Sequence, residues 1–213
     1  MENLPSPFST NLVVISIGLT LQQKIGAGID DNILRKRHTN LIWRTNVQAY
    51  IRLARQADEP FLWQMLYYAA HMPDDGERSS DAAKNNPGLQ KYVQGWGRQS
   101  DLGVLALHPH DQRPLGAAWL RLFIEDKKMS PLIPDGTPEL AIAVLPDFVG
   151  QGIGSQLLKH LLATASKLYP AIMLSVRIDN PAHNLYERMG FETIDTALNR
   201  VGTPSFVMLN RLQ

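Results

Sequence analysis

Residues 144–155 read VLPDFVGQGIGS, and this stretch decides the fold. Before it, Leu140–Leu145 is an apolar run of strand length. After it, leucines recur at helical spacing as far as Leu168, and Pro170 ends the helix. Ala171–Val176 is a second apolar run of strand length. The stretch therefore predicts a parallel strand–helix–strand unit inside an α/β fold.

Three glycines at the turn suggest an anion site. Gly150, Gly152 and Gly154 remove Cβ atoms where a backbone would have to approach a ligand closely. The first amides of a helix lack internal partners, and the helix dipole favours phosphate or pyrophosphate there. A plain strand-to-helix turn explains this motif alone equally well. A P-loop is excluded because no lysine follows Gly152 or Gly154, and a dinucleotide fingerprint because Leu157 replaces its third glycine.

The remaining apolar patterns predict a mixed sheet with flanking helices. Asp58 resembles an N-cap, and the polar residues 71–86 indicate a loop. The further strands are expected at Tyr50–Arg55, Gly103–Leu107, Leu115–Phe123, Phe191–Ile194 and Phe206–Leu209, and the further helices at 58–70, Leu89–Trp96 and Pro181–Met189.

Composition bounds the class of protein. The 213 residues, 44% of them hydrophobic, suit one domain with a substantial core. Lys plus Arg is 21 and Asp plus Glu is 20, so charge gives no case for a nucleic-acid or membrane-surface partner. The absence of cysteine excludes disulfides, thiol nucleophiles and Cys-ligated metals, and we expect no metal site. Leu12–Leu19 is too short for a membrane span and makes a poor secretory signal, so we expect a cytoplasmic protein.

Residues 1–48 read differently from the rest. Their apolar residues fit neither the helical nor the strand period, and prolines and glycines interrupt them. We predict an N-terminal appendage over 1–48 and a folded domain over 49–213. Whether the appendage is disordered or docks a partner protein stays open.

A second block, residues 179–191, reads DNPAHNLYERMGF. It leaves a strand, starts a helix and presents Tyr186 on that helix. A phenol is a neutral donor at pH 7, with an ordinary pKa of about 10, and suits protonation of a leaving thiolate. Taken alone, packing between helix and sheet is the better explanation of Tyr186.

The glycine-rich block and the block around Tyr186, in this order along the chain, resemble the GCN5-related N-acetyltransferase (GNAT) superfamily. Its cofactor motif, Gln/Arg-x-x-Gly-x-Gly/Ala, falls on residues 149–154, and its downstream Asn, Leu-Tyr and Gly-Phe fall on Asn180, Leu185-Tyr186 and Gly190-Phe191. The resemblance covers 50–213 and implies a central mixed, mostly antiparallel sheet with a parallel splayed strand pair. Val149 departs from the motif, and we expect weaker cofactor affinity because the longer side chain is missing.

The resemblance also implies a mechanism with acetyl-CoA as the co-substrate. The pantetheine arm would lie along Ile142, Ala143 and Val144, in the gap between the splayed strands. Asn180 would contact the cofactor near the arm, and Tyr186 would face the sulfur and act as the acid. The pyrophosphate would sit over Gly150, Gln151, Gly152, Ile153, Gly154 and Ser155. A valine at Gly152 is expected to clash with the ligand and leave the domain folded.

The general base is open. Some relatives carry a glutamate on the strand before the second block, where this chain has Ser175. Glu139, just before the cofactor strand, is the best remaining carboxylate, although a solvated strand-end charge is about as good an explanation. His183 or an ordered water could also take the proton.

The predicted function is an N-acetyltransferase that acts on a primary amine of a small molecule or peptide by direct attack in a ternary complex. Acidic residues in the loop Met72–Arg78 could attract a cationic amine, or could simply be solvated. The alternative is a non-catalytic acyl-CoA-binding module or regulatory subunit. Val149 and Ser175 favour this alternative, whereas Tyr186 favours the enzyme. A homodimer stays open.

Overall fold

A computed structural model describes residues 48–123 and 129–212. The predicted appendage therefore lies outside the described residues, apart from Gln48. The described elements are β1 Tyr50–Leu53, η1 Gln56–Asp58, α2 Glu59–Ala69, α3 Asp81–Lys84, α4 Pro87–Gln90, β2 Leu102–Leu107, β3 Pro114–Arg121, β4 Glu139–Val144, η2 Pro146–Phe148, α5 Ile153–Ala165, β5 Ala171–Arg177, α6 His183–Arg188, β6 Glu192–Leu198 and β7 Pro204–Arg211.

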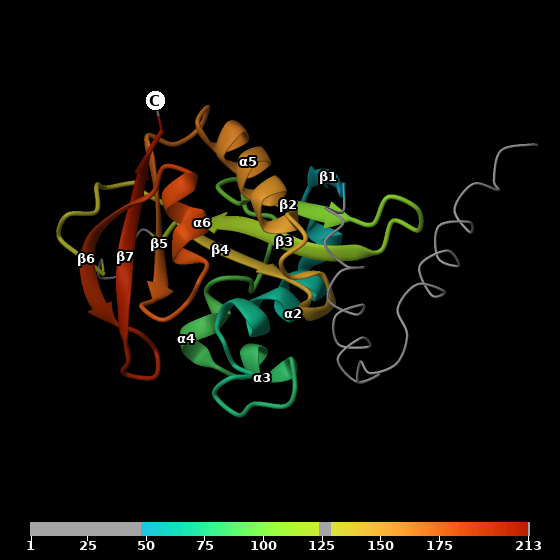
Figure 1. Ribbon diagram of the computed structural model, residues 1–213, viewed down its shortest axis with the longest axis horizontal. Helices are drawn as coiled ribbons and strands as arrows, with labels where there is room; N and C mark the ends of the chain where they lie inside the picture. Colours follow the sequence, from blue (N-terminus) through green and yellow to red (C-terminus); the bar gives the residue numbers. More distant parts are fainter. Residues whose placement is uncertain (1–47, 124–128, 213) are drawn as a thin grey trace, which may run out of the picture. The chain divides into compact units, whose positions relative to one another are not determined.

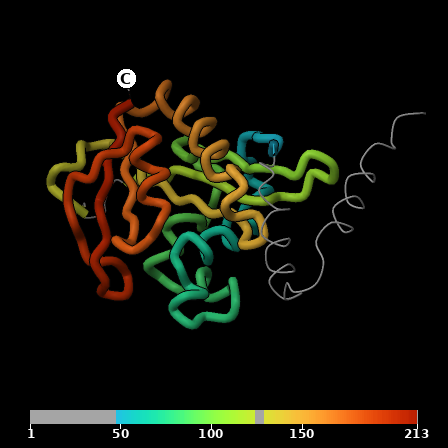
Figure 2. Tube along the Cα trace, viewed as in Figure 1, coloured from blue at the N-terminus to red at the C-terminus, as the bar shows by residue number. Residues whose placement is uncertain are grey.

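The strands form one seven-stranded sheet with the order β1-β2-β3-β4-β5-β7-β6 (Figure 1). Every neighbouring pair is antiparallel except β4 and β5. The prediction of a mixed, mostly antiparallel sheet with one parallel pair is confirmed. The parallel pair is the strand–helix–strand unit that the sequence predicted, with α5 as its crossover (Figure 2).

The parallel pair is joined at one end only. Its register within the described residues consists of Glu139 opposite Met173, where the Met173 N–H donates to the Pro138 carbonyl at 3.0 Å. Toward Val144 and Arg177 the two strands continue without further pairing, so they splay apart. The splay leaves backbone groups of β4 without a strand partner on the β5 side.

Helices cover both faces of the sheet. On one face α5 buries an apolar stripe against alternate residues of the central strands, among them Leu140. On the other face α2 packs against the intervening residues, among them Ala141 and Ala143. The small side chains on that face of β4 let α2 lie close to the strand at the edge of the splay.

Two local predictions were wrong. The loop expected over residues 71–86 contains the short helix α3, Asp81–Lys84. The expected helix Leu89–Trp96 ends early, because α4 stops at Gln90 and a turn follows. Arg121, from the distant strand β3, donates to the carbonyls of Lys91 and Gln94 and fixes this turn. Its guanidinium also pairs with Asp101 at 2.6 Å, with both side chains almost fully buried.

Asp58 is the N-cap residue of α2, as predicted, but its side chain makes no cap hydrogen bond. Its carboxylate instead accepts two hydrogen bonds from the Arg52 guanidinium, both at 2.7 Å, and this ion pair lowers the pKa of Asp58. The pair ties β1 to the start of α2.

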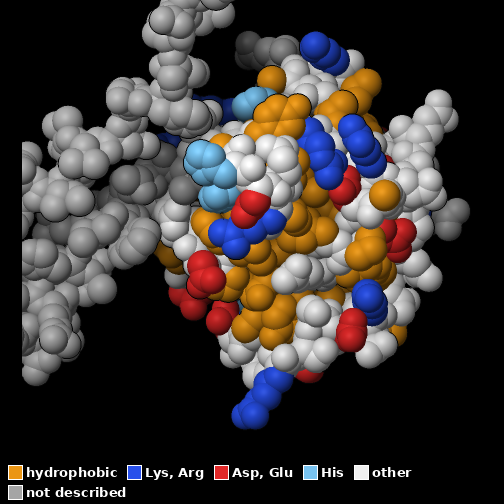
Figure 3. Space-filling model, turned by 90° about the vertical axis from the view of Figure 1, so that its right-hand side faces the viewer, with side chains coloured by type: hydrophobic (Ala, Val, Ile, Leu, Met, Phe, Trp, Pro, Cys, Tyr) orange, Lys and Arg blue, Asp and Glu red, His pale blue; other side chains and the backbone are white. Residues whose placement is uncertain are grey.

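The surface carries charges of both signs. On the face in Figure 3, hydrophobic side chains gather near the centre, with acidic and basic side chains around them. No helix among the described residues is long and apolar enough to span a bilayer.

Candidate active site

The loop after β4 presents uncapped helix amides at the open end of the splay. Gly150 has φ +79° and Gly152 has φ +80°, in the left-handed region that favours glycine. Gly152 is the N-cap of α5, and among the described residues no side-chain cap hydrogen bond closes the amino end of the helix. Ile153–Ser155 form the first turn of α5, and backbone amides in such a position can donate to an anion.

The backbone at Gly152 changes one expectation from the sequence. A valine there would be strained by its φ of +80° even without ligand. We therefore predict that Gly152→Val lowers the free energy of unfolding by about 1–2 kcal/mol or more, measured by chemical denaturation. Gly154→Ala is the control, because Gly154 has ordinary helical geometry and an added Cβ would lie 3.4 Å from Leu185 Cδ2. Equal stability of the two variants would contradict the left-handed conformation of Gly152.

The strand expected to bind the arm borders the splay. Ile142 and Val144 are half-buried, whereas Ala143 between them is buried. By the alternation along the strand, the backbone groups of Ile142 and Val144 face the gap toward β5, where a peptide-like arm could add hydrogen bonds, whereas those of Ala143 face β3. Val149, which stands where the motif has Arg or Gln, is 67% exposed, so most of its side chain faces solvent and does not pack against the protein.

Tyr186 is buried on α6, in the cluster that also holds α5. Its ring meets Phe191 edge-on, with the centroids 6.0 Å apart. Its hydroxyl has no hydrogen-bond partner among the described residues. Burial raises the pKa of Tyr186 to about 12, so the phenol stays protonated at every ordinary pH. Because an unfolded tyrosine ionises near pH 10, this group stabilises the fold below that pH and loses its contribution as the pH rises toward 12.

Glu139 is buried, and its surroundings differ from the solvated strand end that the sequence also allowed. The Tyr92 hydroxyl donates to Glu139 Oε1 at 2.9 Å. By the strand alternation, Glu139 lies on the face of Ala141 and Ala143, which α2 covers. Tyr186 lies in the cluster on the other face. The structure thus places the two predicted catalytic residues on opposite faces of the sheet, with Glu139 at the paired end of β4 and β5.

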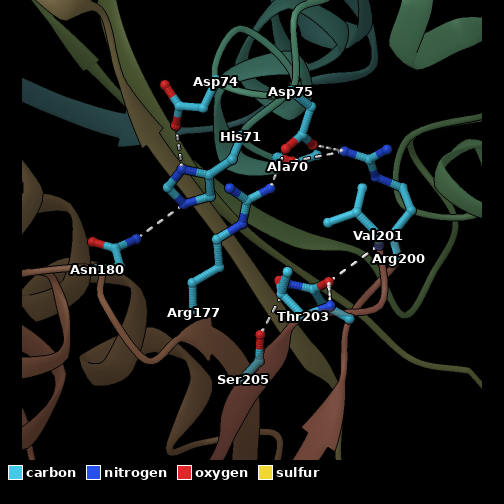
Figure 4. A network of polar contacts seen from close by, with 11 residues as sticks. Ala70, His71, Asp74, Asp75, Arg177, Asn180, Arg200, Val201, Thr203 and Ser205 are labelled. Carbon is cyan, nitrogen blue, oxygen red and sulfur yellow. Dashed lines mark hydrogen bonds and ion pairs between the residues drawn. The ribbon is translucent and has the colours of Figure 1, made fainter.

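Asn180 follows β5 and is held at both ends of its amide, and Figure 4 shows the contact of one end with His71. Its Oδ1 accepts from the Ala182 N–H at 2.9 Å, and its Nδ2 lies 2.9 Å from His71 Nε2. His71 Nδ1 in turn lies 2.9 Å from Asp74 Oδ2. The sequence did not indicate His71 or Tyr92, because both meet their partners across long chain separations.

The loop after α2 is less acidic than its sequence suggests. Asp75 forms ion pairs with Arg177, at 2.7 Å, and with Arg200 (Figure 4). Partial burial opposes ionisation of Asp75, but the two guanidinium groups outweigh it and lower its pKa. Asp75 is therefore paired with two arginines of the same chain. Asp74 and Glu77 are the acidic residues of the loop that remain to attract a cationic amine.

His183, the other residue considered as a base, contacts side chains of α6, β6 and β7. The His183 ring lies against Phe206, with the centroids 4.9 Å apart, and reaches Thr193 and Glu187 at 3.4 and 3.8 Å. These contacts tie α6 to the last two strands. Among the described residues, no group of His, Cys, Asp and Glu side chains could hold a metal ion.

Several solved structures share this fold. A GnaT-family acetyltransferase from Bordetella pertussis matches with a TM-score of 0.57 and 18% identity, over 77% of this chain and 96% of that one. The aminoglycoside acetyltransferase AAC(6')-Ib in complex with coenzyme A gives 0.54 and 19%, over 77% and 95%. The spermidine/spermine N-acetyltransferase SpeG from Vibrio cholerae gives 0.51 and 16%, over 78% and 95%. At these identities the likeness shows the fold.

Sequence comparison gives the family. A search of curated proteins found no significant match. The profile of the Acetyltransferase (GNAT) family matches residues 63–191, more than half of the chain, and this range includes both the glycine loop and the block around Tyr186. The enzymes of this family use acetyl-CoA as the co-substrate. The chain belongs to the GNAT family of acetyltransferases.

Proposed function

We propose that this protein transfers the acetyl group of acetyl-CoA to a primary amine of a small molecule or peptide. One observation carries the proposal: β4 and β5 splay apart where the uncapped amino terminus of α5 meets the open end of the gap. A pantetheine arm could pair with β4 in that gap while its pyrophosphate meets the helix amides.

In the proposed reaction the neutral amine attacks the thioester carbonyl in a ternary complex. The C–N bond forms, the C–S bond breaks, and coenzyme A leaves as a thiolate. Glu139 or an ordered water takes the proton that the nitrogen loses, and Tyr186 donates to the thiolate sulfur. Glu139 and Tyr186 lie on opposite faces of the sheet, so the proton of the attacking amine and the sulfur of the leaving group would be served by separate residues.

The acceptor class is supported by structural neighbours. AAC(6')-Ib is solved with kanamycin, and the SpeG enzyme is a spermidine/spermine N-acetyltransferase. Both kinds of acceptor are small molecules with amines. We extend this class, and peptide amines, to the present chain.

The direct test is an acetyl-CoA consumption assay with the full chain and a panel of polyamines, aminoglycosides, amino acids and peptides. We expect release of coenzyme A that depends on the acceptor and on enzyme concentration. Binding of acetyl-CoA without turnover on any member of the panel would favour the non-catalytic acyl-CoA-binding module, a role to which the missing motif side chain at Val149 also points.

Glu139→Gln tests the base. The variant keeps the shape of the side chain and an oxygen that can accept from Tyr92, but it loses basicity. We predict a turnover about 10²–10⁴-fold lower at neutral pH, partly restored at high pH where more of the amine is already neutral. The pH–rate profile checks this. An equal loss at every pH would mean that Glu139 positions the acceptor, and no loss would assign the proton to water.

A further inference from the structure

His71 occupies a backbone position that usually belongs to glycine. The His71 N–H donates to the Tyr68 carbonyl at 3.0 Å and the Met72 N–H to the Tyr67 carbonyl at 3.2 Å, the hydrogen bonds of a Schellman motif at the end of α2. His71, the first residue after the helix cap, has φ +55°. A non-glycine residue in this conformation is strained unless its surroundings hold it there. Its side chain is therefore the feature to explain.

The hydrogen bonds of the side chain determine the tautomer. Asn180 Oδ1 accepts from the Ala182 N–H, so the amide orientation is fixed and Nδ2 must face His71. Since Nδ2 can only donate, His71 Nε2 must be the acceptor and carry no hydrogen. The proton is then on Nδ1, which donates to Asp74 Oδ2. Asp74, His71 and Asn180 form a hydrogen-bond relay in which donation runs from Asn180, in the turn after β5, through His71 to Asp74, in the loop after α2.

This relay leaves one amide hydrogen of Asn180 for a ligand. An amide nitrogen has two hydrogens, and His71 receives one of them. We propose that Asp74 and His71 are positioning residues that hold Asn180 so that its second amide hydrogen faces the carbonyls of the pantetheine arm. The inference rests on the proposed function, which brings the cofactor to this turn.

A second contact joins the same two segments. Asp75, next to Asp74, pairs with Arg177, three residues before Asn180, and with Arg200 from the β6–β7 turn (Figure 4). The ion pairs hold the loop against the end of β5 whatever stands at position 71. A substitution of His71 should therefore release the Asn180 amide without releasing the loop.

Two substitutions separate the nitrogen atoms of the imidazole. His71→Asn tolerates the left-handed backbone and keeps a donor near the place of Nδ1, but it has no acceptor where Nε2 lies. His71→Gln places an acceptor near the position of Nε2. His110→Asn is the matched control, because His110 is exposed in the turn between β2 and β3 and its ring lies against His108, away from Asn180 in the chain.

We expect His71→Asn to weaken acetyl-CoA binding by roughly 5–10-fold in calorimetry, the loss of about one hydrogen bond. Its KM for acetyl-CoA should rise more than its kcat falls, and its melting temperature should not decrease. His71→Gln should recover most of the affinity, and His110→Asn should match the wild type. In long-range ¹⁵N–¹H spectra of the wild type, neutral His71 should be the Nδ1–H tautomer.

Three results would overturn the inference. Wild-type affinity in His71→Asn would show that the relay does not reach the cofactor. A loss of affinity that follows a drop in melting temperature would show a structural role only. A collapse of kcat in His71→Gln with intact affinity would make His71 the proton acceptor. Failure of the wild type itself to bind acetyl-CoA would instead reject the proposed function, and the inference with it.

Discussion

Tyr186→Phe should lower turnover by about 10²–10³-fold and leave acetyl-CoA affinity nearly unchanged. The phenylalanine ring keeps the packing against Phe191, so the change removes only the hydroxyl. In the proposed site this hydroxyl is the donor that meets the developing thiolate. Steady-state kinetics with saturating acetyl-CoA, together with calorimetric affinity, would measure both quantities.

The high pKa of Tyr186 defines this role. A phenol with a pKa of about 12 is a much weaker acid than a thiol, whose pKa is near 8.5. Full proton transfer to a free thiolate is therefore uphill. A hydrogen bond to sulfur as its charge develops stabilises the transition state without that transfer, as the donors of an oxyanion hole do. The acid predicted from the sequence is better described as this kind of donor.

Stability provides the control for Tyr186. The hydroxyl has no partner among the described residues, so its removal should not lower the melting temperature. Unchanged turnover in a stable Tyr186→Phe variant would leave Tyr186 as a packing residue. A large loss of affinity with normal turnover would instead assign it to cofactor binding.

Ser155→Asp should weaken acetyl-CoA binding by about 10²-fold or more. Ser155 is the third residue of α5, where a carboxylate would compete with the pyrophosphate for the helix amides and repel it. Two unit charges about 4 Å apart near a protein surface repel by roughly 4 kcal/mol, which supports an effect of this size. Calorimetric titration with acetyl-CoA would measure the loss.

The same substitution should not destabilise the protein. An acidic residue in the first turn of a helix is favourable by about 0.3–1 kcal/mol, so the melting temperature should stay the same or rise. Ser155→Asn, similar in shape but neutral, is the matched control and should bind nearly as well as the wild type. Equal affinity of the Asp and Asn variants would place the pyrophosphate away from α5.

The central part of the fold could be predicted because its signals are local. The apolar run ending at Leu145, the glycine turn and the leucine stripe of α5 are each contiguous in sequence, and the parallel unit follows from their order. The turn after α4 could not be predicted in this way. Its carbonyls are bonded by Arg121, about 30 residues further along the chain, so nothing in the local pattern shows where the helix ends.

The same distinction applies to the site. Asn180 and Tyr186 lie in a contiguous block and were identified from the sequence, whereas His71 meets Asn180 across a separation of 109 residues. A signal was present in the sequence, since a helical run ends at Ala70 without the glycine that commonly follows a helix. Only the structure shows that His71 takes that position and what its imidazole contacts.

The most direct test of the cofactor site is a calorimetric titration of acetyl-CoA into the full-length chain. The proposed site predicts saturable binding of one acetyl-CoA per chain, with a melting temperature that rises with ligand concentration. At about 100 times the dissociation constant, the ligand should stabilise the fold by roughly 2.7 kcal/mol. No heat of binding and no thermal shift at millimolar acetyl-CoA would contradict the assignment of the splay and the α5 amides as the acetyl-CoA site.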